Sequence, residues 1–299
     1  MMDNLASIKS SQATNSSSKQ GKVILVGAGP GDPNLLTLGA LNAMQSADVI
    51  VYDNLVSHEI RALFPADTTK KYVGKAKGQH SSTQEEINQI LIETAKQGQT
   101  VCRVKGGDSF VFGRGGEEML CLAKNGIKVN VVPGITAASG CTSYSNIPLT
   151  HRGLAQGCTY ITAHAEKDLE IQWSALAQLN QTLVIYMGVS KVELISNNLI
   201  KAGMSSSTPV ALIEKGCCPE QRTFTGRLDE LAQLKEQHQV RSPALIVIGE
   251  VVSVAEQMKR LEETNQLSQL GPLSEQQTIT LEMHLQSDEQ KTEQLKLTA

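Results

Sequence analysis

The sequence is poor in aromatic residues, which make up only 3% of its 299 residues and include a single tryptophan, Trp173. Proteins that bind single-stranded nucleic acid stack bases on aromatic side chains, so this scarcity argues against such a role. The formal net charge of −3 also leaves no broad basic field for a phosphate backbone. We therefore expect no nucleic-acid partner, and an anionic substrate would need locally gathered cations.

Long apolar runs are also missing, since no segment approaches the roughly 20 residues that cross a bilayer. The serine-rich N-terminus lacks the apolar centre of a secretory signal and contains no arginine. We expect residues 1–21 to form a disordered tail. The sequence thus favours a cytoplasmic protein without a membrane partner.

Cysteine occurs six times, but never as a C-x-x-C pair of the kind used in zinc and redox sites. Disulfide frameworks are typical of much shorter secreted chains. We therefore expect reduced thiols that pack as small apolar side chains, and no metal site.

A buried strand and a glycine-rich loop open the folded part of the chain. Residues 23–26 form a continuous apolar run that ends at Gly27, as in a strand buried on both faces. Asp32-Pro33 then predicts a helix N-terminus. Apolar residues at three-residue steps across 35–44 predict one buried face of that helix.

The same alternation of strand and helix continues, which predicts two α/β domains with mostly parallel strands. Pro133-Gly134 marks the expected boundary between an N-terminal domain (22–133) and a C-terminal domain (134–261). The Gln- and Glu-rich segment 262–299 is expected to be a disordered or loosely helical tail. A capping box is predicted at Ser82–Glu85, and further strands at 47–52, 100–104, up to Val132, 158–162, 182–186, 209–213 and 244–248.

The first strand and loop also suggest a dinucleotide-binding unit, with Asp53 ending the next strand. That fingerprint requires G-x-G-x-x-G, whereas the glycines here fall at 27, 29 and 31 and Asp32 takes the third position. A carboxylate there would face a pyrophosphate. An NAD(P)-binding oxidoreductase or nucleotide sensor is therefore the weaker alternative, and a tight turn without a ligand stays open.

Eight segments occur in order along the chain: VGAGPGDPNLLTLGA (26–40), IVYDNLVS (50–57), VGK (73–75), KGGDSFVFGRGGEE (105–118), VVPGITAASGC (131–141), IPLTHR (147–152), VIYMG (184–188) and SPALIVIGEVV (242–252). Together they resemble the tetrapyrrole methyltransferase family, and the match runs from about Lys22 to Val252. The family fold implied is two α/β domains with a cofactor cleft between them, usually in a homodimer, and the implied methyl donor is S-adenosyl-L-methionine.

The segments GRGGEE, PGITAASGC and PLTHR are most similar to the branch that methylates uroporphyrinogen III at C2 and C7. That reaction gives precorrin-2 through precorrin-1, for sirohaem and cobalamin. Some members carry an additional dehydrogenase/ferrochelatase module, and with 21 residues before the first strand we expect the stand-alone form. Another methylase of the same fold, such as an RNA methylase, stays an alternative.

The resemblance also implies site residues by their place in the motifs. Asp53 and Lys75 match positions with acid–base roles. The cofactor positions are Pro30, Gly106, Gly107, Asp108, Val111, Thr136, Ala137, Met187 and Gly216. Because the implied substrate carries eight carboxylates, we expect Lys75, Arg103, Lys105, Arg114 and Arg152 as candidate cations. Two positions depart from the family pattern, with Ser109 in place of proline and Cys217 in place of threonine.

Several of these residues also have a purely structural interpretation. Asp53 could be a turn former at the end of its strand. Asp108 could shape an Asx-turn in the glycine-rich loop. Arg114 could pair with Glu117 or Glu118.

Overall fold

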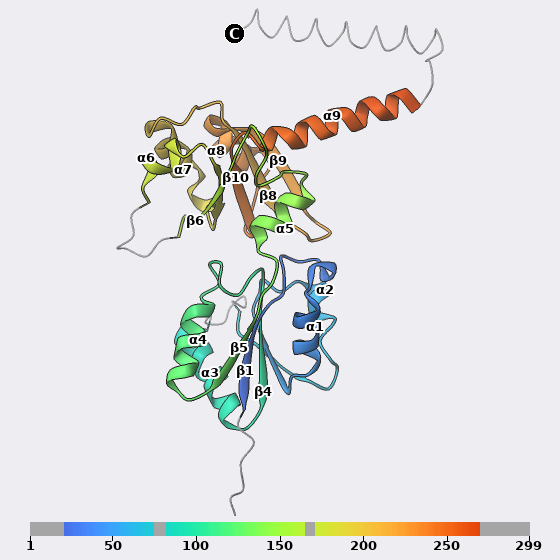
Figure 1. The fold of residues 1–299 in the computed structure, drawn as a ribbon, viewed down its shortest axis with the longest axis vertical. Helices are drawn as coiled ribbons and strands as arrows, with labels where there is room; N and C mark the ends of the chain where they lie inside the picture. Colours follow the sequence, from blue (N-terminus) through green and yellow to red (C-terminus); the bar gives the residue numbers. More distant parts are fainter. Residues whose placement is uncertain (1–20, 75–81, 165–170, 270–299) are drawn as a thin grey trace, which may run out of the picture. The chain divides into compact units, whose positions relative to one another are not determined.

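The computed structural model describes residues 21–74, 82–164 and 171–269. The chain divides into two compact units, Met1–Val252 and Ser253–Ala299. Both β-sheets belong to the first unit (Figure 1), and so do all the contacts of the candidate site described below. Among the described residues, no helix combines the length and apolar character that a membrane span requires.

The first sheet has five strands in the order β3-β2-β4-β1-β5, all parallel. They are β1 (Lys22–Gly27), β2 (Val49–Tyr52), β3 (Thr69–Tyr72), β4 (Thr100–Lys105) and β5 (Lys128–Val132). Since the strands are parallel, the loops that follow them all leave from the same edge of the sheet.

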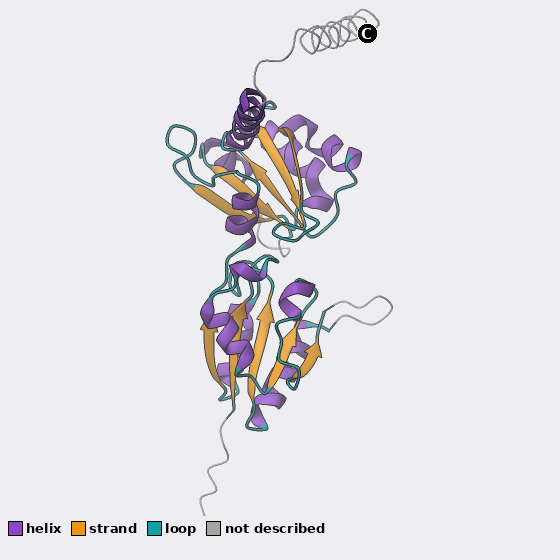
Figure 2. Cartoon of the chain, turned by 90° about the vertical axis from the view of Figure 1, so that its right-hand side faces the viewer, coloured by secondary structure: helices purple, strands orange, loops and turns teal. Residues whose placement is uncertain are grey.

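Helices cover both faces of this sheet (Figures 1 and 2). On one face lie α1 (Leu38–Gln45) and α2 (His58–Arg61), and on the other lie α3 (Gln84–Lys96) and α4 (Gly115–Lys124). Ile24 and Val26 of β1 join the first core, whereas Val23 and Leu25 join the second. Burial on both sides explains why β1 is an unbroken apolar run, as predicted.

The second sheet has the order β6-β7-β10-β8-β9. Its strands are β6 (Cys158–Thr162), β7 (Thr182–Tyr186), β8 (Pro209–Glu214), β9 (Arg222–Arg227) and β10 (Ala244–Ile248). Only the β6–β7 pair is parallel, because β10 runs antiparallel to β7 and β8, and β9 antiparallel to β8. The expectation of mostly parallel strands is therefore wrong for this sheet. The link between β8 and β9, residues 215–221, is too short for a parallel crossover.

The second sheet buries its main core against α6 (Trp173–Gln178), α7 (Val192–Lys201) and α8 (Leu231–Gln237). The helix that follows Pro133-Gly134, α5 (Ala137–Tyr144), packs against β10. Two short 3-10 helices, Val189–Lys191 and Leu228–Glu230, precede α7 and α8.

Two predicted helix starts are displaced in the structure. The Asp32 carboxylate accepts from the backbone N–H of Asn34 (2.7 Å) and caps only a 3-10 turn, Pro33–Leu35. Thr37 then caps α1 separately, which leaves Leu38 80% exposed instead of on a buried face. The capping box lies one residue later than predicted, between Thr83 and Glu86.

The last helix, α9 (Val252–Gln269), continues past Glu262, where the sequence pattern led us to expect a disordered or loosely helical tail. An ion pair between Lys259 and Glu263, one turn apart, lies on this helix.

Candidate functional site

Three loops from the first sheet meet through glycine backbones at its carboxyl edge. Gly29 and Gly107 exchange hydrogen bonds, with N···O distances of 3.0 and 2.7 Å. A side chain on Gly134 would place its Cβ 2.5 Å from the carbonyl oxygens of Gly107 and Gly27. Gly107 has a φ of +72°, which glycine adopts without strain. The loops after β1, β4 and β5 can therefore approach this closely only without side chains.

The Asp108 carboxylate holds these loops together. One oxygen accepts from the backbone N–H groups of Phe110 (2.8 Å) and Val111 (3.0 Å), which forms the Asx-turn considered from the sequence. The other oxygen accepts from the N–H of Gly134 at 3.3 Å, across the gap to the loop after β5. Asp108 and Val111 thus shape the loop, and their contact with a ligand stays a prediction.

Tyr186, at the end of β7, ties the second sheet to this region. Its hydroxyl lies 2.6 Å from Thr136 Oγ1 and accepts from the backbone N–H of Ala138 at 2.8 Å. The ring of Phe112 lies 4.8 Å from its ring. Burial raises the pKa of Tyr186, so its phenol stays neutral. The next residue, Met187, has a φ of +54° and is half exposed.

Sequence reasoning did not select Tyr186 as a site residue, although it stands inside the VIYMG segment beside Met187. Its hydrogen-bond partner Thr136 was selected, together with Ala137 at the N-terminus of α5. A buried tyrosine hydroxyl needs a hydrogen-bond partner, but the partner lies far along the chain and only the fold shows it.

Pro30 and Gly216 both contact α5. A Cβ on Gly140 of α5 would lie 2.5 Å from Pro30 Cγ, and a Cβ on Gly216 would overlap the Cys141 thiol. The Cys141 thiol also hydrogen-bonds Cys217, which raises the pKa of Cys141 and lowers that of Cys217. The cysteine at position 217 therefore replaces the family's threonine within a hydrogen-bonded thiol pair.

Asp53 stands directly after β2, next to Arg103 of β4. Its Oδ2 forms an ion pair with Arg103 Nη2 at 3.0 Å, and its Oδ1 accepts from the backbone N–H of Leu55 at 3.0 Å. The Arg103 side chain is only 3% exposed, whereas that of Asp53 is 22% exposed. Asp53 is thus both the turn former considered from the sequence and a charged group that reaches solvent.

Glu118 of α4 lies beneath this pair and is completely buried. Its Oε1 accepts from Arg103 Nε (3.4 Å), Lys105 Nζ (3.0 Å) and Gln84 Nε2 (3.2 Å). Burial lowers the pKa of Lys105, with a smaller contribution from the charge of Arg103, while Glu118 opposes the shift. That Arg103 and Lys105 bind substrate stays a prediction, although both are buried against Glu118.

The remaining candidate cations lie elsewhere. Arg114 forms two hydrogen bonds with Glu117, at 2.9 and 2.7 Å, and both side chains are about half exposed. Of the two partners considered from the sequence, the structure therefore shows Glu117. Arg152 is exposed, and its carbonyl oxygen lies 2.9 Å from His151 Nδ1. Lys75 lies outside the described residues.

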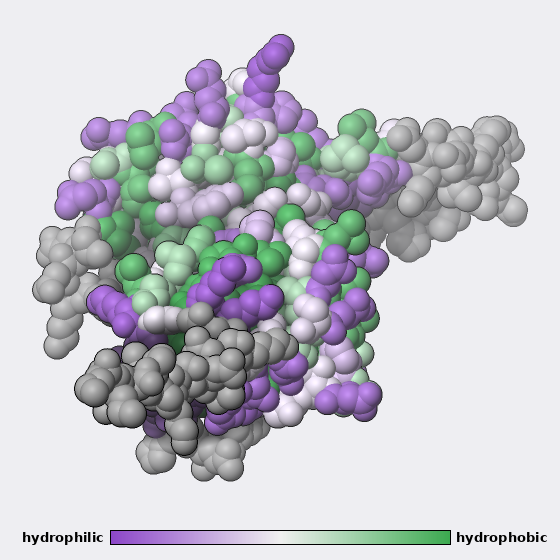
Figure 3. Space-filling model, turned by 60° about the horizontal axis from the view of Figure 1, so that its bottom comes forward, coloured by the Kyte–Doolittle hydropathy of each residue, from purple (hydrophilic) through white to green (hydrophobic). Residues whose placement is uncertain are grey.

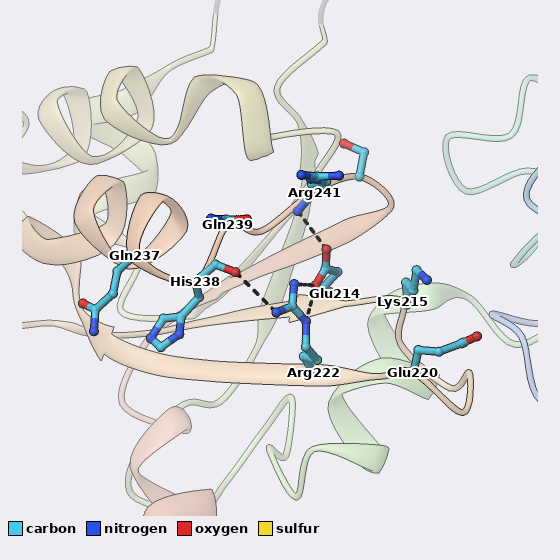
Figure 4. Close-up of a pocket in the computed structure, with 9 residues that line it drawn as sticks. Glu214, Lys215, Glu220, Arg222, Gln237, His238, Gln239 and Arg241 are labelled. Atoms are coloured by element: carbon cyan, nitrogen blue, oxygen red, sulfur yellow. Dashed lines mark hydrogen bonds and ion pairs between the residues drawn. The ribbon is translucent and has the colours of Figure 1, made fainter. Parts of the chain in front are cut away.

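A hollow of about 640 Å³ beside β8 and β9 contains none of the predicted site residues (Figure 4). Arg222 pairs with Glu214 (Nε···Oε2 2.7 Å) and donates to the carbonyl oxygen of His238. The backbone N–H of Arg241 donates to the other oxygen of Glu214. Because these groups satisfy one another, we assign this hollow no part in the chemistry.

Comparison with known proteins gives a matching family profile and similar curated proteins. The family profile of the tetrapyrrole (corrin/porphyrin) methylases matches residues 22–232. The chain is 53% identical over 240 residues to a siroheme synthase of Pseudoalteromonas translucida, covering 80% of this chain and 51% of that protein. A siroheme synthase of Acinetobacter baylyi is 52% identical over 243 residues, with 81% and 53% covered. The chain thus spans about half the length of these curated relatives.

Solved structures are similar over nearly their whole length. The uroporphyrin III C-methyl transferase of Thermus thermophilus superposes with a TM-score of 0.68 at 40% identity, covering 78% of this chain and 94% of that one. The same Thermus protein was also solved in complex with S-adenyl homocysteine.

Proposed function

Because the chain belongs to the tetrapyrrole (corrin/porphyrin) methylase family, we propose that it methylates uroporphyrinogen III at C2 and then at C7. Both methyl groups come from S-adenosyl-L-methionine, and the product is precorrin-2, formed through precorrin-1. The observation that carries the proposal is the likeness to the Thermus uroporphyrin III C-methyl transferase, at 40% identity over 94% of that chain.

S-adenosyl-L-methionine would supply an electrophilic methyl group, and the loops described above suit it. The Gly106-Gly107 turn carries no side chains, so backbone groups can approach a ligand closely. Met187 offers a half-exposed, polarisable surface for an adenine ring. The residues that we propose to hold the methyl donor are Pro30, Gly106, Gly107, Asp108, Val111, Thr136, Ala137, Met187 and Gly216.

Exposed apolar side chains beside these loops suit the faces of a macrocycle. Leu55 is 58% exposed and lies against Gly106, while Phe112 is 38% exposed and lies on Tyr186. Hydrophobic residues are visible among hydrophilic ones on the face drawn in Figure 3. For the substrate carboxylates we propose the side chains of Arg114 and Arg152, together with Lys75, because the first two are accessible.

The proposed reaction is a direct displacement in which a carbon of the reduced macrocycle attacks the sulfonium methyl. The protein contributes mainly proximity and alignment. As the carbon attacks, positive charge develops on the conjugated pyrrole nitrogen. Asp53, partly exposed at the end of β2, would stabilise this charge and accept the proton. Lys75 would return a proton or hold a substrate carboxylate.

The product would supply sirohaem and cobalamin synthesis. The siroheme synthases among the relatives support the first destination. We further propose a cytoplasmic homodimer with no nucleic-acid partner, in keeping with the family resemblance and the net charge of −3.

The test is anaerobic incubation with uroporphyrinogen III and S-adenosyl-L-methionine, followed by mass measurement. The proposal requires a product with two added methyl groups. A parallel calorimetric titration should show binding of S-adenosylhomocysteine and none of NADP. Binding of NADP alone would overturn the proposal in favour of an oxidoreductase, and cofactor binding without methylation would indicate another acceptor.

A further inference from the structure

Glu118 combines complete burial with an uneven use of its two oxygens. Three donors converge on Oε1, from two cations of β4 and one amide of α3. Oε2 is buried as well, and it has no hydrogen-bond partner among the described residues. A buried carboxylate of this kind costs free energy that ordinary packing would avoid.

The charges around Glu118 balance only when Asp53 is included. Arg103 and Lys105 bring two positive charges into the interior, where they are 3% and 5% exposed. Glu118 supplies one negative charge, and Asp53 supplies the other at 3.0 Å from Arg103 Nη2. Of the four side chains, that of Asp53 is the most exposed, at 22%. The cluster therefore connects a buried carboxylate to a carboxylate that reaches solvent.

The guanidinium of Arg103 is the connecting element. Its Nε donates to Glu118, its Nη1 donates to the carbonyl oxygen of Val104 at 3.0 Å, and its Nη2 donates to Asp53. Because a guanidinium is planar and rigid, fixing Nε and Nη1 also fixes the direction of Nη2. The orientation of the Asp53 carboxylate follows from that direction and from its bond to the N–H of Leu55.

We infer that Glu118 is a positioning residue that acts through Arg103 to orient the Asp53 carboxylate for methyl transfer. This inference rests on the proposed function, since it assumes the role of Asp53 given above. In this arrangement, Arg103 and Lys105 pair with the carboxylates of Glu118 and Asp53 within the protein itself.

The test substitutions are Glu118→Gln, which keeps the shape and removes the charge, and Glu93→Gln as the control. Glu93 lies exposed on α3, where it accepts from Gln89. We expect Glu118→Gln to lower kcat roughly 10- to 100-fold, because a small displacement of a reacting group has effects of that size. Its affinity for S-adenosylhomocysteine should stay within about twofold, since the side-chain partners of Glu118, which are Arg103, Lys105 and Gln84, are not among the residues proposed to hold the cofactor.

The decisive readout is the double substitution Asp53→Asn with Glu118→Gln. If Glu118 acts through Asp53, adding Glu118→Gln to Asp53→Asn lowers kcat further by less than about twofold. If Glu118→Gln lowered kcat by the same factor in the wild-type protein and in Asp53→Asn, its role would be merely structural and the inference would be overturned. Unchanged kcat in Glu118→Gln, with active wild-type protein, would also overturn it.

Arg103→Lys provides a second variant if Glu118→Gln does not fold. It keeps the positive charge but cannot bridge both carboxylates, so the same fall in kcat and the same non-additivity with Asp53→Asn are expected. Full activity of Arg103→Lys would contradict the inference. Failure of the proposed function itself would be recognised separately, because the wild-type protein would then add no methyl group to uroporphyrinogen III.

Discussion

The hydroxyl groups of Tyr186 and Thr136 lie 2.6 Å apart and join the end of β7 to the N-terminus of α5. The same phenol accepts the backbone N–H of Ala138 at 2.8 Å. The second sheet is thereby fixed to the helix that follows the first sheet, at residues that we propose to contact the methyl donor.

Tyr186→Phe should therefore reduce stability. The substitution removes both hydrogen bonds and leaves the N–H of Ala138 without its acceptor, which costs about 1–3 kcal/mol. Denaturation by urea, followed by circular dichroism, would measure the change. Tyr72→Phe is the control, because the hydroxyl of Tyr72 lies on the edge strand β3 at 3.4 Å from Asn54. Equal stability of Tyr186→Phe and wild-type protein would show that the two bonds contribute nothing.

Asp53→Asn should separate catalysis from cofactor binding. It preserves the shape of the side chain but removes the charge that would stabilise the attacking pyrrole, so kcat should fall roughly 10²–10⁴-fold. Affinity for S-adenosylhomocysteine, measured by calorimetry, should stay near normal. A variant that turns over at the wild-type rate, or that fails only because it no longer binds the cofactor, would refute the role of Asp53.

Met187→Arg should weaken cofactor binding at least about tenfold, because a charge would face the adenine in a partly desolvated site. Calorimetry would measure the affinity for S-adenosylhomocysteine, with Met258→Arg as the control variant. Met258 is similarly exposed, at 40% against 49%, but lies on α9. If both variants bound S-adenosylhomocysteine as tightly as the wild-type protein, the adenine would not lie against Met187.

The contact between Tyr144 and Asp32 should titrate at both ends of the pH scale. The Tyr144 hydroxyl donates to Asp32 Oδ2 at 2.5 Å, which raises the pKa of Tyr144 to about 12 and lowers that of Asp32. For the tyrosine, the stabilisation is complete below about pH 10 and is lost as the pH rises through 12. For Asp32, the stabilisation is complete above about pH 3.9 and is lost as the pH falls through the lowered pKa of its carboxyl group.

Asp32→Asn is the matching experiment. Tyrosinate absorbance should show one residue ionising at a lower pH in the variant than in the wild-type protein. Tyr160, whose pKa burial raises to about 12, should keep its value and serves as an internal reference. Identical titration curves would show that the contact is absent in solution.

Much of the fold could be predicted because its central strands are buried. The runs that became β1, β2, β7, β8 and β10 are mostly apolar, and β4 is recognisable from the apolar residues Val101, Cys102 and Val104. The edge strand β3 was missed since all four residues of Thr69–Tyr72 are exposed, and β9 since the run Arg222–Arg227 contains a single large apolar side chain, Phe224. Strand direction was wrong in the second sheet because apolar runs do not encode it.

For the candidate site, too, the sequence predicted some features and missed others. The family resemblance and the α/β fold of the family are confirmed, whereas the close approach of the glycine loops after β1, β4 and β5 is seen only in the structure. Glu118 was considered only as a partner for Arg114. Its true partners, Arg103 and Lys105, come from a strand on which ordinary patterning expects apolar residues at buried positions. Such an ion-pair cluster depends on distant segments meeting in register.

The central claim, sequential methylation of uroporphyrinogen III, is tested most directly by an anaerobic time course with S-adenosyl-L-methionine and mass detection. The account predicts a species with one added methyl group that rises and then falls as a species with two added methyl groups accumulates and remains. A tetrapyrrole whose mass stays unchanged while the protein binds S-adenosylhomocysteine, or methylation that continues beyond two groups as the main product, would contradict it.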